Sequence, residues 1–146
     1  MAIKRDEKPT TKLESTYKKF WQGFNESSRR SIPFRKIFKP HPFGSIRSYQ
    51  DYSVGDVFHI VAGINFERSE IRVGAYFTDI DSYQYFHELN KELIEERVGK
   101  LLAWKEHKTK ASAYVYDTAD FDENHGWKNA YEMMIPRMLQ IREQFR

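Results

Sequence analysis

The sequence lacks cysteine altogether, and its seven glycines are isolated from one another along 146 residues. Without cysteine the chain cannot form a disulfide framework, an iron–sulfur cluster or a cysteine-ligated zinc site, and it has no thiol nucleophile. Isolated glycines rule out a glycine-rich phosphate-binding loop, and the Gly-x-Ser-x-Gly nucleophile elbow is also missing. These absences exclude several large classes of enzyme and leave no residue assigned to catalysis.

Long apolar runs are absent too. No stretch approaches the roughly 18 apolar residues of a membrane-spanning helix. Residues 1–12 are rich in lysine, arginine and threonine and have no apolar periodicity, so we expect a disordered tail rather than a secretory signal. The remainder, 13–146, is expected to form a single domain of a cytoplasmic protein that makes no membrane contact.

The chain is well supplied with charged residues (31%) and aromatic residues (16%), a composition that fits one compact domain. Apolar spacing predicts the order helix, hairpin, helix, hairpin, helix. We therefore expect an α+β fold in which a mostly antiparallel sheet of four to five strands is packed by three helices. The expected elements are a helix at 13–24, strands at 49–53, 57–64 and 71–77, a helix at 83–98, strands at 101–106 and 111–116, and a helix at 127–145.

Two of the expected helices carry apolar stripes that we predict to face the core. Gly99 is placed to end the earlier helix in a left-handed cap, and Pro136 is expected to kink the later one. The stripes are Tyr83, Phe86, Leu89, Leu93 and Ile94 in the earlier helix, and Trp127, Tyr131, Met134, Met138, Ile141 and Phe145 in the later one.

The segment 29–47, called here the basic arm, contains three prolines and no acidic residue, and it is predicted to be a long loop or an extended arm. Its six positive charges exceed the net charge of the whole chain, +3, so the rest of the chain is acidic on balance. Clustered cations suit phosphate binding, and neighbouring aromatic rings can stack on bases. The candidate nucleic-acid-binding residues are Arg29, Arg30, Arg35, Lys36, Lys39 and Arg47, together with Phe34 and Phe38.

A purely structural interpretation of the basic arm stays open. In it Phe34 and Phe38 fill the core while the cations remain in water. Loss of the two rings would then lower stability rather than weaken binding to single strands.

Acidic residues gather at Asp117, Asp120 and Asp122, just before the last expected helix. Carboxylates can hold a hard cation, but the spacing and the central glycine of a calcium loop are missing. We therefore predict that this cluster caps the helix and complements its dipole. The five histidines show no metal-ligand spacing, so we expect no metal site and no cofactor.

The order of residues resembles that of the DUF4268 family, a domain of unknown function, from about Tyr17 to Phe145. In that family the domain often follows a restriction-endonuclease-like nuclease part, so the resemblance implies a DNA-related accessory role without assigning catalysis. The basic arm matches the family pattern least, and nothing there is carried over. The matching features are Tyr17, Trp21 and Phe24, then Phe58, His59 and Ile60 leading to Asn65, then 71–74, 92–104 and 110–112, and finally Asp117, Asp120 and Asp122 ahead of Trp127.

These observations favour a small non-catalytic binding module in a DNA-processing or defence setting that contacts nucleic acid through the basic arm. One alternative is a metal-dependent, nuclease-like enzyme that uses Asp56, Glu70 and Arg72 or the acidic cluster. The other is a protein–protein interaction module, including a homodimer formed through the last helix, where Ile135 and Leu139 widen the apolar arc.

Overall fold

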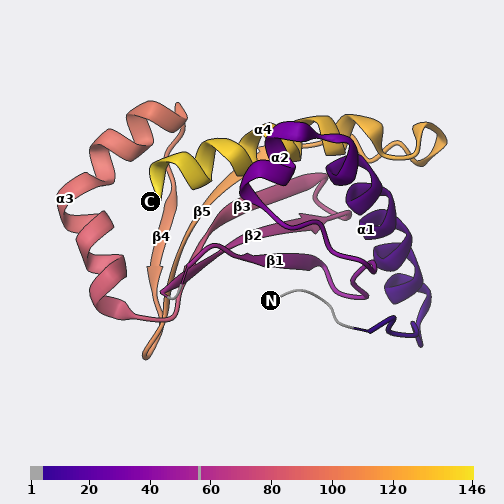
Figure 1. The fold of residues 1–146 in the computed structure, drawn as a ribbon, viewed down its shortest axis with the longest axis horizontal. Helices are drawn as coiled ribbons and strands as arrows, with labels where there is room; N and C mark the ends of the chain where they lie inside the picture. The colour runs from indigo at the N-terminus through magenta and orange to yellow at the C-terminus, as the bar shows by residue number, and fades with distance from the viewer. Residues whose placement is uncertain (1–4, 56) are drawn as a thin grey trace.

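The computed structural model describes residues 5–55 and 57–146, and Figure 1 shows their arrangement. It confirms the predicted α+β class and the antiparallel sheet. One further helix, inside the basic arm, is added to the three that were predicted. The elements are α1 (Lys12–Arg30), α2 (Ile32–Ile37), β1 (Tyr49–Ser53), β2 (Phe58–Asn65), β3 (Glu70–Phe77), α3 (Ile80–Val98), β4 (Ala103–Glu106), β5 (Ala111–Thr118), a 3₁₀ turn (Glu123–His125) and α4 (Lys128–Gln144).

The five strands form one sheet in the order β1-β2-β3-β5-β4, and every neighbouring pair is antiparallel. Side chains alternate across a strand, so each strand gives one face to the core. On β3 that face is Ile71, Val73, Ala75 and Phe77, all fully buried. In Figure 1 the helices lie on one side of the sheet, and α4 runs across β3 and β2.

Helix α4 closes the core as its periodicity predicts, because every residue of its stripe from Trp127 to Phe145 is buried. Tyr131 fixes α4 against α1 by donating its hydroxyl proton to the carbonyl oxygen of Phe20 at 2.7 Å. A Cβ at Gly23 would lie only 2.3 Å from that hydroxyl, so glycine is needed at this crossing. Pro136 lies inside α4, as the sequence predicts.

Helix α1 continues six residues beyond its predicted end, because polar residues that favour turns in water are satisfied inside this fold. The Ser28 hydroxyl donates to the carbonyl oxygen of Phe24 at 2.8 Å, which keeps it within the helix. Asn25 is fully buried and bonds to another buried amide, Gln50. The end predicted near Phe24 was therefore wrong, since tertiary hydrogen bonds override the local preference.

Helix α3 ends at Gly99 in the left-handed conformation, with a φ of 82°, as predicted. It begins at an Asp79 cap rather than at 81 or 82, because the Asp79 carboxylate accepts from the amide of Asp81 at 2.9 Å. The predicted stripe was wrong at Leu89 and Leu93, which are exposed. The stripe is confirmed at Tyr83, Phe86 and Ile94, which are buried together with Val98, since α3 packs on the sheet and α4 along one side only. No described helix has both the length and the apolar character needed to span a membrane.

Candidate nucleic-acid interface

The basic arm is a folded part of the domain rather than an extended loop. It contains the end of α1 and the short helix α2, which begins where the Ser31 hydroxyl accepts from the amide of Phe34 at 3.2 Å. Pro33 lies in the first turn of α2, where a missing N–H costs nothing. The prediction of a loop throughout 29–47 was therefore wrong, because proline was read as a breaker where it starts a helix.

Phe34 and Phe38 are core residues. Their exposed fractions are 0% and 2%, their ring centroids lie 4.9 Å apart, and Phe34 meets Tyr52 edge-on at 5.7 Å. A ring held this way presents no free face to a base. The structure therefore removes Phe34 and Phe38 from the candidate interface and favours the structural interpretation of these two rings.

A buried hydrogen-bond network fixes the rest of the arm to α1 and β1. The side-chain amide of Gln50 donates to the Asn25 side-chain oxygen at 2.8 Å and to the Tyr52 hydroxyl at 2.9 Å, and its oxygen accepts from the amide of Ser45 at 3.3 Å. Asn25 also donates to the carbonyl oxygen of Phe43 at 3.1 Å. Because buried polar groups that are fully bonded rigidify a structure, the arm presents its charges from a fixed backbone.

His41 belongs to this scaffold and does not act as a ligand. Its Nε2 lies 2.7 Å from the carbonyl oxygen of Asp51, which can only accept, so Nε2 carries the proton. Burial lowers the pKa of His41, although the hydrogen bond and the charge of Asp51 oppose that shift. The imidazole is consequently neutral at physiological pH and ties the arm to β1.

All six candidate cations are exposed, but they divide into two groups. Arg29 donates to the carbonyl oxygen of His41 at 3.1 Å, and Arg47 pairs with Glu7 at 3.0 Å, a contact that raises the pKa of Arg47. The side chains of the other four make no hydrogen bond or ion pair with any residue that the structure describes. We call these four the basic surface: Arg30, Arg35, Lys36 and Lys39.

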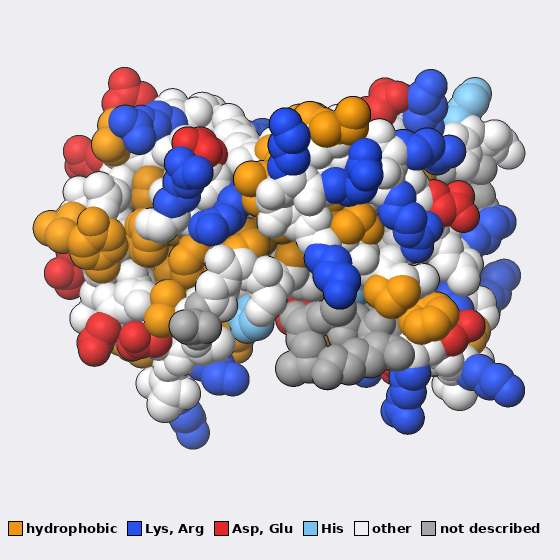
Figure 2. Space-filling model, viewed as in Figure 1, with side chains coloured by type: hydrophobic (Ala, Val, Ile, Leu, Met, Phe, Trp, Pro, Cys, Tyr) orange, Lys and Arg blue, Asp and Glu red, His pale blue; other side chains and the backbone are white. Residues whose placement is uncertain are grey.

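Figure 2 shows the setting of the basic surface. Lysine and arginine side chains gather over the half of this face formed by α1 and α2, whereas most of its acidic side chains lie over the half that holds α3. The contact between Glu7 and Arg47, together with an ion pair between Asp6 and Lys18, also binds residues of the predicted tail to the folded domain. Residues 1–4 lie outside the described part of the chain.

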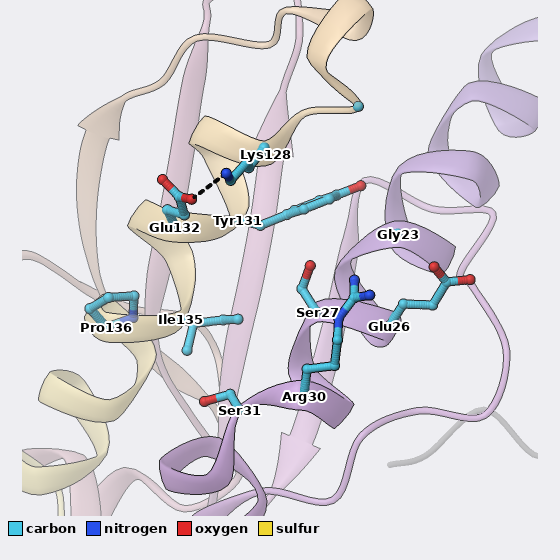
Figure 3. Close-up of a pocket in the computed structure, with 11 residues that line it drawn as sticks. Gly23, Glu26, Ser27, Arg30, Ser31, Lys128, Tyr131, Glu132, Ile135 and Pro136 are labelled. Atoms are coloured by element: carbon cyan, nitrogen blue, oxygen red, sulfur yellow. Dashed lines mark ion pairs between the residues drawn. The ribbon is translucent and has the colours of Figure 1, made fainter.

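A cleft of about 710 Å³ opens between α1 and α4 beside the basic surface. In Figure 3, Arg30 extends over it from α1, while Lys128 and Glu132 come from α4. Lys128 and Glu132 pair at 3.7 Å. The other lining residues include Glu26, Ser27, Tyr131 and Ile135, so the cleft has both polar and apolar walls.

The acidic cluster does not cap α4 as predicted. The first helical residue follows Trp127, which adopts a left-handed φ of 57° and makes no side-chain cap bond. Asp122 instead caps the preceding 3₁₀ turn by accepting from the amide of Asn124 at 3.0 Å, and its bond to His125 lowers the pKa of its carboxyl. Among residues 5–55 and 57–146, no three histidine, aspartate or glutamate side chains are grouped as a metal site would require.

Asp117 has a structural role. Its two carboxylate oxygens each accept from Arg137 at 2.8 Å, and Lys100 donates to it at 3.1 Å. Partial burial opposes ionisation, but the hydrogen bonds and charges of Arg137 and Lys100 lower the pKa of Asp117 below its usual value. This ion pair joins β5 to α4.

The residues of the nuclease-like alternative are only partly within the described structure. Asp56 lies outside it, while Glu70 and Arg72 are two residues apart on β3 and so share a face of the sheet. The Arg72 guanidinium lies 5.8 Å from the Tyr114 ring, in space that a Cβ at Gly63 would fill. Arg72 therefore packs along the sheet.

The face of the sheet opposite the helices is a surface that sequence reasoning missed. Tyr76 and Tyr114 are half-buried there, Tyr116 is exposed, and burial raises the pKa of Tyr114. The signal was present in the strands, because these residues alternate with the core positions of β3 and β5. Aromatic rings with a free face can stack on bases.

The DUF4268 family profile, described as a domain of unknown function, matches residues 16–146. Since the match covers nearly the whole chain, the protein belongs to the DUF4268 family, as the resemblance of its motifs indicated. No protein with a curated description and no solved structure matches the chain. The family name carries no activity, so functional inference rests on the surfaces described above.

Proposed function

We propose that this protein is a non-catalytic binding module that holds the phosphate backbone of nucleic acid on its basic surface, in a DNA-processing or defence setting. The observation that carries the proposal is the four exposed cations of the basic surface, which have no hydrogen-bond or ion-pair partner in the described structure and project from a fixed backbone. Phosphate binding there would break no ion pair that residues 5–55 and 57–146 make with these cations.

The chemistry of the basic surface favours the backbone over the bases. Phe34 and Phe38 are buried, so the contact is electrostatic and releases counterions from the nucleic acid. Four phosphate contacts give a log–log slope of affinity against salt of about −3.6 on a duplex and about −2.8 on a single strand. Such binding is independent of base sequence.

The test measures binding of a fluorescent duplex and of a matched single strand over a range of salt concentrations. Arg35→Gln combined with Lys36→Gln removes two proposed contacts, and the slope should fall by about two units. Both side chains are exposed, so the thermal melt should not change. The control combines Lys91→Gln with Arg97→Gln on α3, which removes the same charge far from the basic surface and should leave the slope in place.

Four results would contradict the proposal. If the wild-type protein binds neither the duplex nor the single strand at low salt, the proposal of nucleic-acid binding is wrong. An equal loss of slope in both double variants would trace the effect to net charge rather than to the basic surface. Binding that survives Arg35→Gln with Lys36→Gln but disappears with Tyr76→Ala and Tyr116→Ala would move the site to the open face of the sheet. Cleavage of the oligonucleotide with magnesium would favour the nuclease-like alternative.

A further inference from the structure

The outer side of α3 carries an apolar stripe that nothing in the described structure covers. Tyr85, Leu89 and Leu93 follow one another at intervals of four residues, so they lie along one side of the helix. Their exposed fractions are 56%, 72% and 42%, and Leu101, just beyond the helix, is 82% exposed. The inner side of α3 is buried against the sheet and α4, so the apolar part of this helix extends beyond the side that the fold covers.

A surface helix of this length normally turns polar residues outward, and an apolar surface that continues past the buried side of a helix is usually covered by a partner. Exposed apolar side chains scattered singly need no explanation, but a regular series does. At the start of α3 the stripe reaches a cleft of about 390 Å³, lined in part by Val57, Phe86 and Tyr85 itself. A row of anchors that ends in a cleft is the form of a helix-docking surface.

Acidic side chains border this stripe. Asp81, Glu88, Glu92 and Glu96 are exposed on the same outer half of α3 and form no ion pair with any described residue. In Figure 2 hydrophobic side chains stand at the outer edge of the molecule, where α3 lies, among acidic ones. The partner that complements this surface therefore carries lysine or arginine beside its apolar residues.

The α3 helix of a second copy is a poor occupant of the same surface. Two α3 helices packed antiparallel would place one acidic border against the other, and like charges there oppose pairing. Nucleic acid is also disfavoured, because its phosphates would meet these carboxylates.

We propose that the outer face of α3 docks an amphipathic helix of another protein, with apolar residues spaced three and four apart and basic residues on its flank. This inference does not depend on the proposed function, since α3 is set apart from α1 and α2, the helices that carry most of the basic surface (Figure 1). Tyr85, Leu89 and Leu93 provide the apolar contacts, and the four carboxylates select a basic partner.

The test selects, on the full chain, from a displayed library of 20-residue helical peptides whose outward positions vary freely. The enriched peptides should be net basic, with apolar residues at i, i+4 and i+7 or i+8. Leu89→Ser should weaken the best peptide at least tenfold, and Glu88→Gln with Glu92→Gln should weaken it and reduce its salt dependence. All three side chains are exposed, so the thermal melt should stay in place. Ile32→Ser, an exposed apolar residue on α2, is the matched control and should bind normally.

Enriched peptides that lack the apolar spacing, or that bind Leu89→Ser as tightly as wild type, would overturn the inference. So would sedimentation showing a dimer that Leu89→Ser dissociates, because a second copy would then occupy the stripe. Leu89→Ser should leave nucleic-acid binding unchanged, so failure of this inference and failure of the proposed function are separately visible.

Discussion

Replacing Phe34 by alanine separates the two interpretations of the basic arm. The Phe34 ring is fully buried, and it contacts Phe24, Phe38 and Tyr52 at centroid distances of 6.1, 4.9 and 5.7 Å. Removing it deletes a large apolar group and leaves a cavity in a fixed cluster, which costs about 3–5 kcal/mol. For a domain of this size that corresponds to a fall in melting temperature of about 10–20 °C.

The assay combines a thermal melt with nucleic-acid binding at a temperature where the variant is still folded. Phe34→Leu is the control, because it retains most of the buried volume and should lose much less stability. The folded Phe34→Ala protein should bind single strands and duplex as wild type does. An unchanged melt together with a selective loss of single-strand binding would refute the reasoning and return the ring to the interface.

Two further predictions concern the scaffold. Trp127→Ala should cost about 3–5 kcal/mol in chemical denaturation, because the buried ring packs against Phe20 at 5.4 Å; a cost below about 1 kcal/mol would show that α4 does not close the core there. Asp117→Asn should cost about 1–3 kcal/mol at neutral pH, where the lowered pKa keeps the native carboxylate charged and paired with Arg137. The unfolded chain binds the proton first as the pH falls below about 3.8, so the stability difference should shrink there, and a difference that grows in acid would contradict the assignment.

Apolar periodicity predicted the elements that bury one continuous stripe. Helix α4 and strands β2, β3 and β5 have partners along their whole length, so pattern and burial coincide. Periodicity failed at Leu89 and Leu93 because it reports that a side of a helix is apolar and not whether the same chain covers it. Leu89 and Leu93, where the prediction failed, are part of the proposed docking surface.

The arm could not be predicted from local preferences because its structure depends on distant hydrogen bonds. Asn25 and Gln50 are separated by 24 intervening residues, yet each completes the other's bonding in the core. Either amide alone is typical of a turn or a surface. Only the pairing of α1 with β1 makes both positions buried, and no spacing rule within one segment encodes that pairing.

The candidate site residues of the arm separate into buried rings and exposed cations, and this separation also depends on tertiary contacts. Phenylalanine residues are interleaved with arginine and lysine in the arm. That pattern fits stacking on bases and core packing equally well, so the composition of the arm does not distinguish the two roles. Helix α2 separates the two roles, since burial of Phe34 within the helix and of Phe38 at its C-cap directs Arg35 and Lys36 outward. The rings that anchor α2 therefore hold the cations in place, whereas the exposed acidic and apolar side chains described above belong to α3, which is set apart from α1 and α2 (Figure 1). On the two proposals above, phosphate would contact the cations of α1 and α2 and a basic helix would contact the carboxylates of α3, so neither ligand would meet the charge that repels it.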